Sequence, residues 1–402
     1  MFQLGIDVFL SSSELKERLK GQRLALLGHP ASMTGQFIHT LDAIMADKDL
    51  NVTAAFGPQH GMRGEKQDNM QETETYLDPV HRIPVFSLYG EVRRPSKEMM
   101  ETFDVLLVDL QDVGTRIYTY LTTLLYVMEE AERFGKSVWV LDRPNPAGRP
   151  IEGTFLRSGW VSFVGAAEGL PMRHGLTLGE AARWFQKTLK LNVDLKVITM
   201  NHYDPESAPG WGWPLGDLPW VNPSPNAATL SMARCFPGTV LLEGTTLSEG
   251  RGTTRPLELM GVPGVDMTRV LKEMERLAPE WMQGCLLRLC YFLPTFQKHA
   301  GQVLSGLQIH VDDNRYNHNL FSPYRLVSLW LKCLRNLQPE MSIWRDFHYE
   351  YEKERLAIDL INGGPELREW VDDFRATPAD FEALCLVDES EWSESRKEIL
   401  LY

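Results

Sequence analysis

The sequence predicts a doubly wound α/β domain with a mostly parallel sheet, followed by a smaller α+β domain. Three observations support this. Apolar runs alternate with helical patterns through the first half of the chain, polar Gly- and Pro-rich clusters follow the apolar runs, and the pattern changes after about residue 233. A length of 402 residues also exceeds the usual size of one domain.

Apolar runs in the first half have the length and composition of strands that are buried on both faces. They cover residues 23–28, 52–56, 83–88, 104–110, 137–141 and 194–199. Amphipathic helical patterns lie between them, over residues 37–47, 95–102, 118–134 and 178–189. Buried strands with helices between them are typical of a doubly wound parallel sheet.

The segments that directly follow these strands carry the unusual chemistry of the chain. They read "GHPAS", "GPQHGMRGEKQDN", "YGEVRRP", "QDVGTRIYTY" and "DRPNPAGRP", whereas the opposite-edge loops 48–51 and 133–136 are short and plain. Ligands of open α/β sheets bind outside the carboxyl ends of the strands. This asymmetry predicts a binding site at that edge.

The second half begins with a long irregular segment. Residues 201–226 hold three Trp and six Pro without periodicity, which favours an ordered functional loop. A helix over 267–277, strands over 285–296 and 306–311, a helix over 323–336 and a charged helical tail follow. We therefore expect an α/β domain over residues 1–232 and an α+β domain over residues 233–402.

Composition narrows the class of protein. The net charge of −13 argues against nucleic acid as a partner, and no apolar stretch approaches the roughly 20 residues of a membrane span. The N-terminal segment reads as neither a signal peptide nor an anchor. Five scattered cysteines without CxxC spacing are typical of reduced core thiols, so we expect a cytoplasmic protein.

Several cofactor and catalytic motifs are missing from the sequence. It lacks GxGxxG at a strand–helix turn, GxxxxGK[ST], HExxH and GxSxG. These absences disfavour dinucleotide binding, P-loop nucleotide hydrolysis, zincin chemistry and the α/β-hydrolase mechanism. We expect neither a cofactor nor a structural metal.

Candidate ligand-binding side chains remain at the predicted sheet edge. They are Gln59, His60, Arg63, Asp109, Asp112, Arg116, Tyr118, Asp142, Asn145, Arg173 and His174. Each has a plainer alternative: an Asp can cap a helix, an Asn can form a turn, and a His can simply be packed. On one helix Tyr118 and Tyr120 would point about 200° apart, so at most one of them should line a site.

A second polar stretch lies at the expected domain junction. "LLEGTTLSEGRGTTRP" (241–256) supplies Glu243, Glu249, Arg251 and Arg255, and "VNPSPN" supplies Asn222, Ser224 and Asn226. The alternative is a solvated loop with weak local ion pairs. Carboxylates, amides and arginines with aromatic rings suit sugars, and carboxylates from two domains can flank a glycosidic bond.

Taken in order, these motifs resemble one family. "FGPQHGMRG", "VDLQDVGTRIYTY", "DRPNP", "RHGLTLGE", "PSPN" and "LLEGTTLSEGRGTTRP" are similar to the exo-β-N-acetylmuramidase (NamZ-like) family, formerly a domain of unknown function. The resemblance implies a Rossmann-like N-terminal domain, a smaller C-terminal domain and a cleft between them. It also implies release of N-acetylmuramic acid from the non-reducing ends of peptidoglycan fragments.

The chain departs from this family at Gln59, where the usual residue is Glu and the expected catalytic acid. An amide cannot donate and recover a proton. Either the protein binds cell-wall sugars without cleaving them, or another acid acts. Glu65 and Glu72 are the nearest candidates, and Asp112, Glu243 and Glu249 are more remote.

The expected ligand is a small amino sugar or muropeptide, taken up as a fragment because the chain lacks the family's usual export signal. A muramic acid carries a lactyl carboxylate, for which arginine is the natural partner. Arg63, Arg116, Arg173, Arg251 and Arg255 are the candidates. A third hypothesis is a metal-dependent hydrolase built on His60, Asp109, Asp112 and His174.

Overall fold

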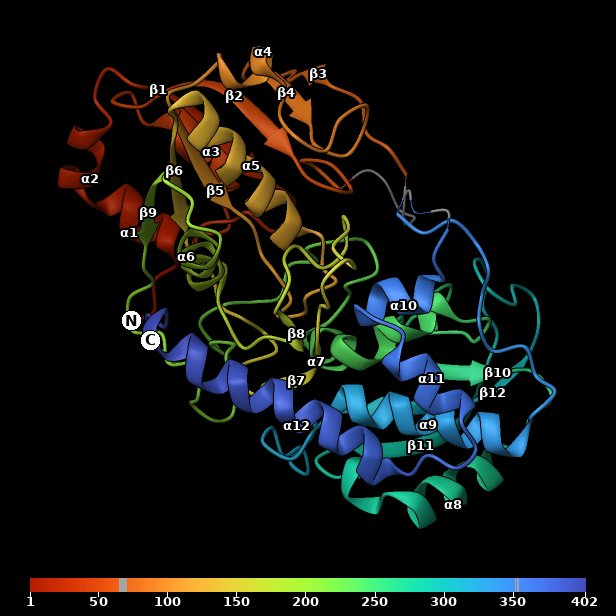
Figure 1. Ribbon diagram of the computed structural model, residues 1–402. Helices are drawn as coiled ribbons and strands as arrows, with labels where there is room; N and C mark the ends of the chain where they lie inside the picture. Colours follow the sequence, from red (N-terminus) through yellow and green to blue (C-terminus); the bar gives the residue numbers. More distant parts are fainter. Residues whose placement is uncertain (65–70, 351, 353) are drawn as a thin grey trace.

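The computed structural model describes residues 1–64, 71–350, 352 and 354–402 (Figure 1). Its N-terminal part is built on a seven-stranded sheet. The strands lie in the order β3-β4-β2-β1-β5-β6-β9, and every neighbouring pair is parallel except β3 with β4. Without the short edge strand β3, this is the strand order of a Rossmann-like sheet, with its switch point between β1 and β5.

The bounds of the sheet strands follow the predicted apolar runs closely. They are β1 (Arg23–Gly28), β2 (Asn51–Gly57), β3 (Tyr76–Leu77), β4 (Pro84–Ser87), β5 (Val105–Asp109), β6 (Ser137–Leu141) and β9 (Asp194–Ile198). All six predicted strands are confirmed. No apolar run predicted β3 or the separate hairpin of β7 (Glu152–Phe155) and β8 (Pro171–Arg173).

Helices cover both faces of this sheet because successive strand residues point to opposite sides. Ala25 and Leu27 pack in the cluster that contains the α5 side, while Leu24 and Leu26 pack in the cluster of the α1 and α3 side. The helices are α1 (Gly5–Ser11), α2 (Ser13–Arg18), α3 (Thr40–Ala46), α4 (Lys97–Met100), α5 (Tyr120–Phe134) and α6 (Leu178–Thr188).

The C-terminal part is smaller and mixes helices with an antiparallel three-stranded sheet of order β10-β12-β11. Its first elements are α7 (Leu230–Thr239), η1 (Val240–Gly244), β10 (Leu259–Val262), α8 (Met267–Leu277), η2 (Pro279–Met282), β11 (Leu286–Phe292) and β12 (Leu304–His310). The rest are α9 (Pro323–Leu337), α10 (Ala357–Asn362), α11 (Glu366–Asp372), α12 (Pro378–Ser395) and η3 (Arg396–Glu398). This architecture confirms the predicted α+β class.

The two parts share one apolar core. A single buried cluster runs from Ala25 in β1 to Trp330 in α9. The chain end returns to the first part, where the Tyr402 hydroxyl donates to Asp142 Oδ2 at 2.9 Å. Figure 1 shows α12 crossing the molecule and the two termini close together. The continuous core holds the carboxyl edge of the large sheet against the C-terminal part.

The long segment 201–226 is folded against the protein, as the sequence predicted. Trp213 is buried and its indole donates to Leu218 O at 2.8 Å, while the Trp211 ring stacks on His318 at 5.3 Å. All five cysteines are free thiols, and four of them are buried. Within the described residues, no helix is long and apolar enough to cross a membrane.

Candidate active site

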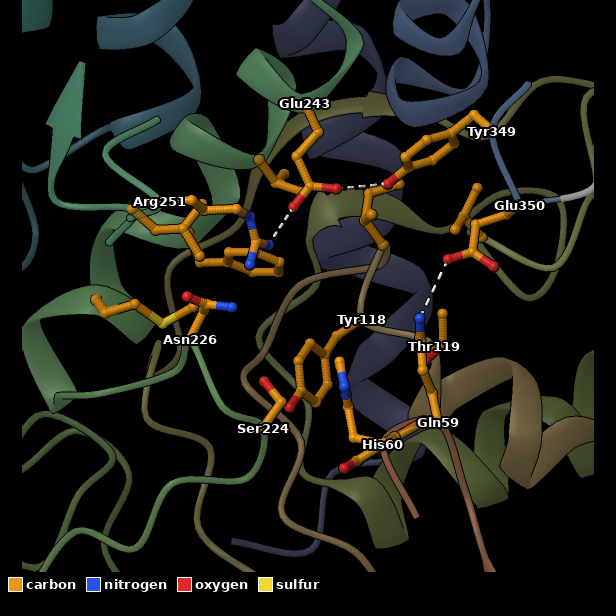
Figure 2. Close-up of a pocket in the computed structure, with 17 residues that line it drawn as sticks. Gln59, His60, Tyr118, Thr119, Ser224, Asn226, Glu243, Arg251, Tyr349 and Glu350 are labelled. Atoms are coloured by element: carbon orange, nitrogen blue, oxygen red, sulfur yellow. Dashed lines mark hydrogen bonds and ion pairs between the residues drawn. The ribbon is translucent and has the colours of Figure 1, made fainter. Parts of the chain in front are cut away.

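A pocket of about 510 Å³, including its mouth, lies where the carboxyl edge of the large sheet meets the C-terminal part (Figure 2). Distant stretches of chain build it: the turns after β2 and β5, the segment around Val164, the end of the 201–226 segment, and three parts of the C-terminal half. Its polar lining residues are Gln59, His60, Tyr118, Thr119, Tyr120, Ser224, Asn226, Glu243, Arg251, Tyr349 and Glu350.

Gln59 reaches the pocket from a tight turn after β2. His60 has φ of 71° and Gly61 has φ of 82°, and a Cβ at Gly57 would lie 2.7 Å from Met62 N. A left-handed conformation at a non-glycine residue such as His60 costs energy, and such residues gather at functional sites. The glycines therefore allow a sharp turn that presents Gln59 and His60.

The orientation of the Gln59 amide is fixed by two neighbours. The Thr119 hydroxyl donates to Gln59 Oε1 at 2.7 Å, so the amide nitrogen faces the other way. Gln59 Nε2 then donates to Glu350 Oε1 at 3.2 Å. Gln59 is 7% exposed, so both hydrogen bonds lie in a largely dry site.

Glu350 comes from the C-terminal half and lies in the same pocket (Figure 2). Its backbone has φ of 44°, between the mutual backbone hydrogen bonds that join Tyr349 and Glu352. The Tyr89 hydroxyl donates to Glu350 Oε2 at 2.7 Å. Burial, opposed by the hydrogen bonds from Tyr89 and Gln59, raises the pKa of Glu350 to about 7.

Glu243 is the second carboxyl group of the pocket, and a cation holds it. Arg251 donates to Glu243 Oε1 at 2.5 Å and the Tyr349 hydroxyl donates to Oε2 at 2.9 Å. Arg251 also lies 3.3 Å from Glu249, which pairs with Lys298 at 2.6 Å. The pocket thus holds one carboxyl group that accepts from an arginine and a tyrosine, and one that accepts from a glutamine and a tyrosine.

An aromatic wall completes the pocket. The rings of Tyr118 and Tyr120 lie edge-to-face at 4.7 Å, and Tyr118 contacts Phe236 in the same way at 5.9 Å. Both tyrosines line the pocket, so the prediction that only one could do so was wrong. The reason is that α5 begins at Tyr120, which leaves Tyr118 in the preceding turn, outside the helical period.

Seven of the candidate residues come together in the pocket: Gln59, His60, Tyr118, Ser224, Asn226, Glu243 and Arg251. The other polar groups at the sheet edge form structural contacts beneath it. Asp109 is bound by Arg143 and Thr40, and Asp112 lies 3.6 Å from His174. These groups tie the strand ends together.

Asp142 and Asn145 likewise stabilise the loops after β6. Asp142 accepts hydrogen bonds from Thr177 at 2.7 Å and from the backbone of Gly179, at the start of α6. Asn145 bridges its own turn to Leu176 O at 3.0 Å. Both side chains are buried away from the pocket lining, which matches the plainer alternative for each.

Four of the five candidate arginines lie outside the pocket lining. Arg63 is half-exposed near Asp42, and Arg255 pairs with Glu258 at 2.9 Å. Arg116 donates to Asn362 O at 2.7 Å and Arg173 to Phe321 O at 3.2 Å, so both stabilise the backbone of the C-terminal half. Arg251 alone among the five lines the pocket.

The remaining candidates are also away from the lining. Glu72 is exposed and pairs with Arg93 at 3.2 Å, Glu249 is buried behind Arg251, and Asn222 is exposed. Glu65 lies outside the described residues.

Sequence reasoning missed Glu350, Tyr349 and Thr119. Glu350 and Tyr349 lie in "HYEYEKER", which reads as part of a charged tail. The one local signal is the alternation of tyrosines with acids, and this pattern predicts no particular structure or function. Thr119 stood inside a quoted motif, but its contact with Gln59 spans 60 residues and appears only in the fold.

The structure also bears on the metal-dependent hypothesis. Among the described residues, no group of three or more His, Cys, Asp and Glu side chains is arranged to hold a metal ion. His60 lines the pocket, whereas Asp109, Asp112 and His174 lie in the buried contacts beneath it.

Two family models, described as the N-terminal and C-terminal parts of exo-beta-N-acetylmuramidase NamZ, match residues 24–231 and 234–402. The chain belongs to the NamZ family. A curated relative, the peptidoglycan beta-N-acetylmuramidase NamZ of Bacillus subtilis strain 168, is 39% identical over 339 residues. That match covers 84% of this chain and 78% of the relative.

Solved structures agree with this family assignment. A DUF1343 family protein of Bacteroides fragilis NCTC 9343 matches with a TM-score of 0.85 and 27% identity. A second DUF1343 family protein of the same organism matches with a TM-score of 0.75 and 25% identity. Each match covers 100% of this chain and 99% of the solved chain.

Proposed function

We propose that this protein is an exo-β-N-acetylmuramidase that releases N-acetylmuramic acid from the non-reducing ends of small peptidoglycan fragments. The observation that carries the proposal is the pocket itself, in which two carboxyl groups face one space beside amides and tyrosines. The B. subtilis relative acts, by its description, on peptidoglycan as a β-N-acetylmuramidase. The sequence motifs that resemble this family supply most of the residues that line the pocket.

The pocket offers the groups that glycoside hydrolysis uses. Hydrolysis needs a proton donor for the leaving oxygen and a second group on the other side of the anomeric carbon. We assign the second role to Glu243, because Arg251 and Tyr349 hold its two oxygens in place. His60, Ser224 and Asn226 would bind sugar hydroxyl or acetamido groups, with Tyr118 against an apolar ring face.

Arg251 is our candidate for the lactyl carboxylate of the sugar, since it is the arginine of the predicted set that lines the pocket. We further propose a division of the chain at residues 232 and 233, next to the ends of the two family matches. A cytoplasmic role in wall-fragment recycling is favoured by the five free thiols, which persist in reducing compartments.

Incubation of the protein with a disaccharide of N-acetylmuramic acid β-linked to N-acetylglucosamine tests this function. We expect both monosaccharides in equal amounts, detected by mass spectrometry. The variant Glu72→Gln serves as a control because it removes an exposed carboxylate outside the pocket lining. No release of N-acetylmuramic acid at any pH from 4 to 9 would contradict the proposal.

A second candidate function is non-catalytic binding of cell-wall sugars, which the neutral amide of Gln59 favours. In that case calorimetry with the same disaccharide should show saturable binding while no monosaccharide forms. Product formation at a rate proportional to enzyme concentration would exclude it.

A further inference from the structure

Glu350 has the surroundings of a proton donor. It is 7% exposed, lines the pocket, and its two oxygens are oriented by Gln59 and Tyr89 from two different loops of the N-terminal part. A carboxyl group whose two oxygens are both hydrogen-bonded cannot rotate freely. The oxygen that carries the proton therefore has a fixed orientation. Fixed geometry is what separates an effective general acid from a nearby carboxyl group.

The amide of Gln59 suits this neighbour better than an acid would. Thr119 occupies its carbonyl oxygen, so the amino group is the part that meets Glu350 Oε1. A carboxylate at the same position would place two acceptor oxygens about 3 Å apart, and the two groups would have to share one proton. The amide instead donates to Glu350 Oε1 and adds no second acid beside it.

The backbone supports the same role. Glu350 has φ of 44° in a turn that is closed by Tyr349 and Glu352, and His60 across the pocket has φ of 71°. A non-glycine residue in this conformation is strained, so the surrounding fold must hold it there. Two such residues, from distant parts of the chain, lie at the place where Gln59 meets Glu350.

The two carboxyl groups of the pocket have different surroundings, as the proton donor and the proton acceptor of a hydrolase require. Arg251 donates to Glu243 across a 2.5 Å contact, whereas Gln59 and Tyr89 donate to Glu350, on which the charge of Arg93 also acts. Burial disfavours the charged form of Glu350, and the neighbouring charge of Glu243 adds to this effect. Two acids with such different hydrogen-bond partners in one site are suited to separate tasks.

We infer that Glu350 is the general acid of this enzyme and that Gln59 is its positioning residue. This inference rests on the proposed function. Glu350 gives its proton to the glycosidic oxygen while the bond from that oxygen to the anomeric carbon breaks. A water molecule adds to the anomeric carbon and gives one proton to Glu243. Glu243 then releases that proton to solvent, and solvent returns one proton to Glu350. One water is consumed for each bond cleaved.

The test compares Glu350→Gln with the wild type on two substrates. One is the natural disaccharide, whose sugar leaving group needs a proton. The other is 4-nitrophenyl β-N-acetylmuramide, whose leaving group departs readily without one. We expect kcat/KM on the disaccharide to fall about 10²–10⁴-fold, the usual contribution of a general acid. The loss on the nitrophenyl glycoside should be less than tenfold.

Two further variants separate catalysis from folding. Glu352→Gln removes an acid of the same turn that pairs with Arg355 at 3.0 Å outside the pocket lining, and it should retain activity within threefold. Glu350→Asp keeps an acid, and its kcat/KM on the disaccharide should be at least tenfold higher than that of Glu350→Gln. Glu350→Gln should still bind N-acetylmuramic acid with a Kd within threefold of the wild type.

Failure of this inference can be distinguished from failure of the proposed function. If the wild type cleaves the disaccharide and Glu350→Gln cleaves it equally well, Glu350 is not the acid and the function stands. Equal losses on both substrates, or lost binding, would show a structural role and also overturn the inference. If the wild type cleaves neither substrate, the proposed function itself fails.

Discussion

The environment of Glu350 predicts a measurable dependence of stability on pH. The pKa of this group is about 7 in the folded protein, mainly because of burial, and 4.5 is its ordinary value in an unfolded chain. Between these values the folded state holds a proton that the unfolded chain has released. The free energy of unfolding therefore falls as the pH rises from about 4.5 through 7, by about 3 kcal/mol in total.

Replacing Glu350 by Gln should remove this pH-dependent loss of stability. The amide can keep its oxygen toward Gln59 Nε2 and turn its amino group toward the Tyr89 oxygen, so the variant should fold. Urea unfolding at pH 5 should give nearly equal stabilities. At pH 8.5 the variant should be more stable than the wild type by about 2–3 kcal/mol.

The difference in stability between the wild type and Glu350→Gln isolates the titration of Glu350. Burial also raises the pKa of Asp142 to about 6 and that of Glu152 to about 7, but these acids are present in both proteins and cancel in the difference. Glu352→Gln should show no such growth of stability with pH. A difference between the wild type and Glu350→Gln that stays within 0.5 kcal/mol from pH 5 to 8.5 would refute this account of the site.

Three further changes in the pocket have expected outcomes. Gln59→Glu would place a second carboxyl group about 3 Å from Glu350, a repulsion of about 5 kcal/mol at an effective dielectric constant of about 20. The alkaline limb of kcat/KM should therefore move up by at least about one pH unit, and an unmoved limb would contradict the contact. Tyr89→Phe removes a hydrogen bond that lowers the pKa of Glu350, so the limb should also rise, as a pH–rate profile will show. Arg251→Met leaves Glu243 buried without its closest cation, and urea unfolding should show a loss of about 3–5 kcal/mol, with a loss below 1 kcal/mol contradicting the role of the ion pair.

The sequence was sufficient for most of the fold because local patterns carried the information. Six apolar runs with helices between them predicted all the parallel strands, since burial on both faces leaves a continuous apolar signal. The hairpin of β7 and β8 left no such signal. Glu152 at its start binds the backbone of Tyr324 and Arg325, a long-range contact that no local pattern records.

The site was predicted only in part, for the same physical reason. Polar clusters that follow the strands one after another predicted a site at the sheet edge, and the candidate pocket lies there. Sequence cannot distinguish a strand-end acid that caps a helix, as Asp142 does, from one that meets a ligand. It also cannot show that Glu350 lies against Gln59, because 291 residues separate the two.

The pH dependence of kcat/KM for the wild-type protein on the N-acetylmuramic acid disaccharide tests the central claim most directly, because it reports the ionisation of the free enzyme. We predict that activity falls with an apparent pKa near 7, as Glu350 loses the proton that the leaving oxygen requires. Activity that stays constant up to pH 9 would contradict the claim.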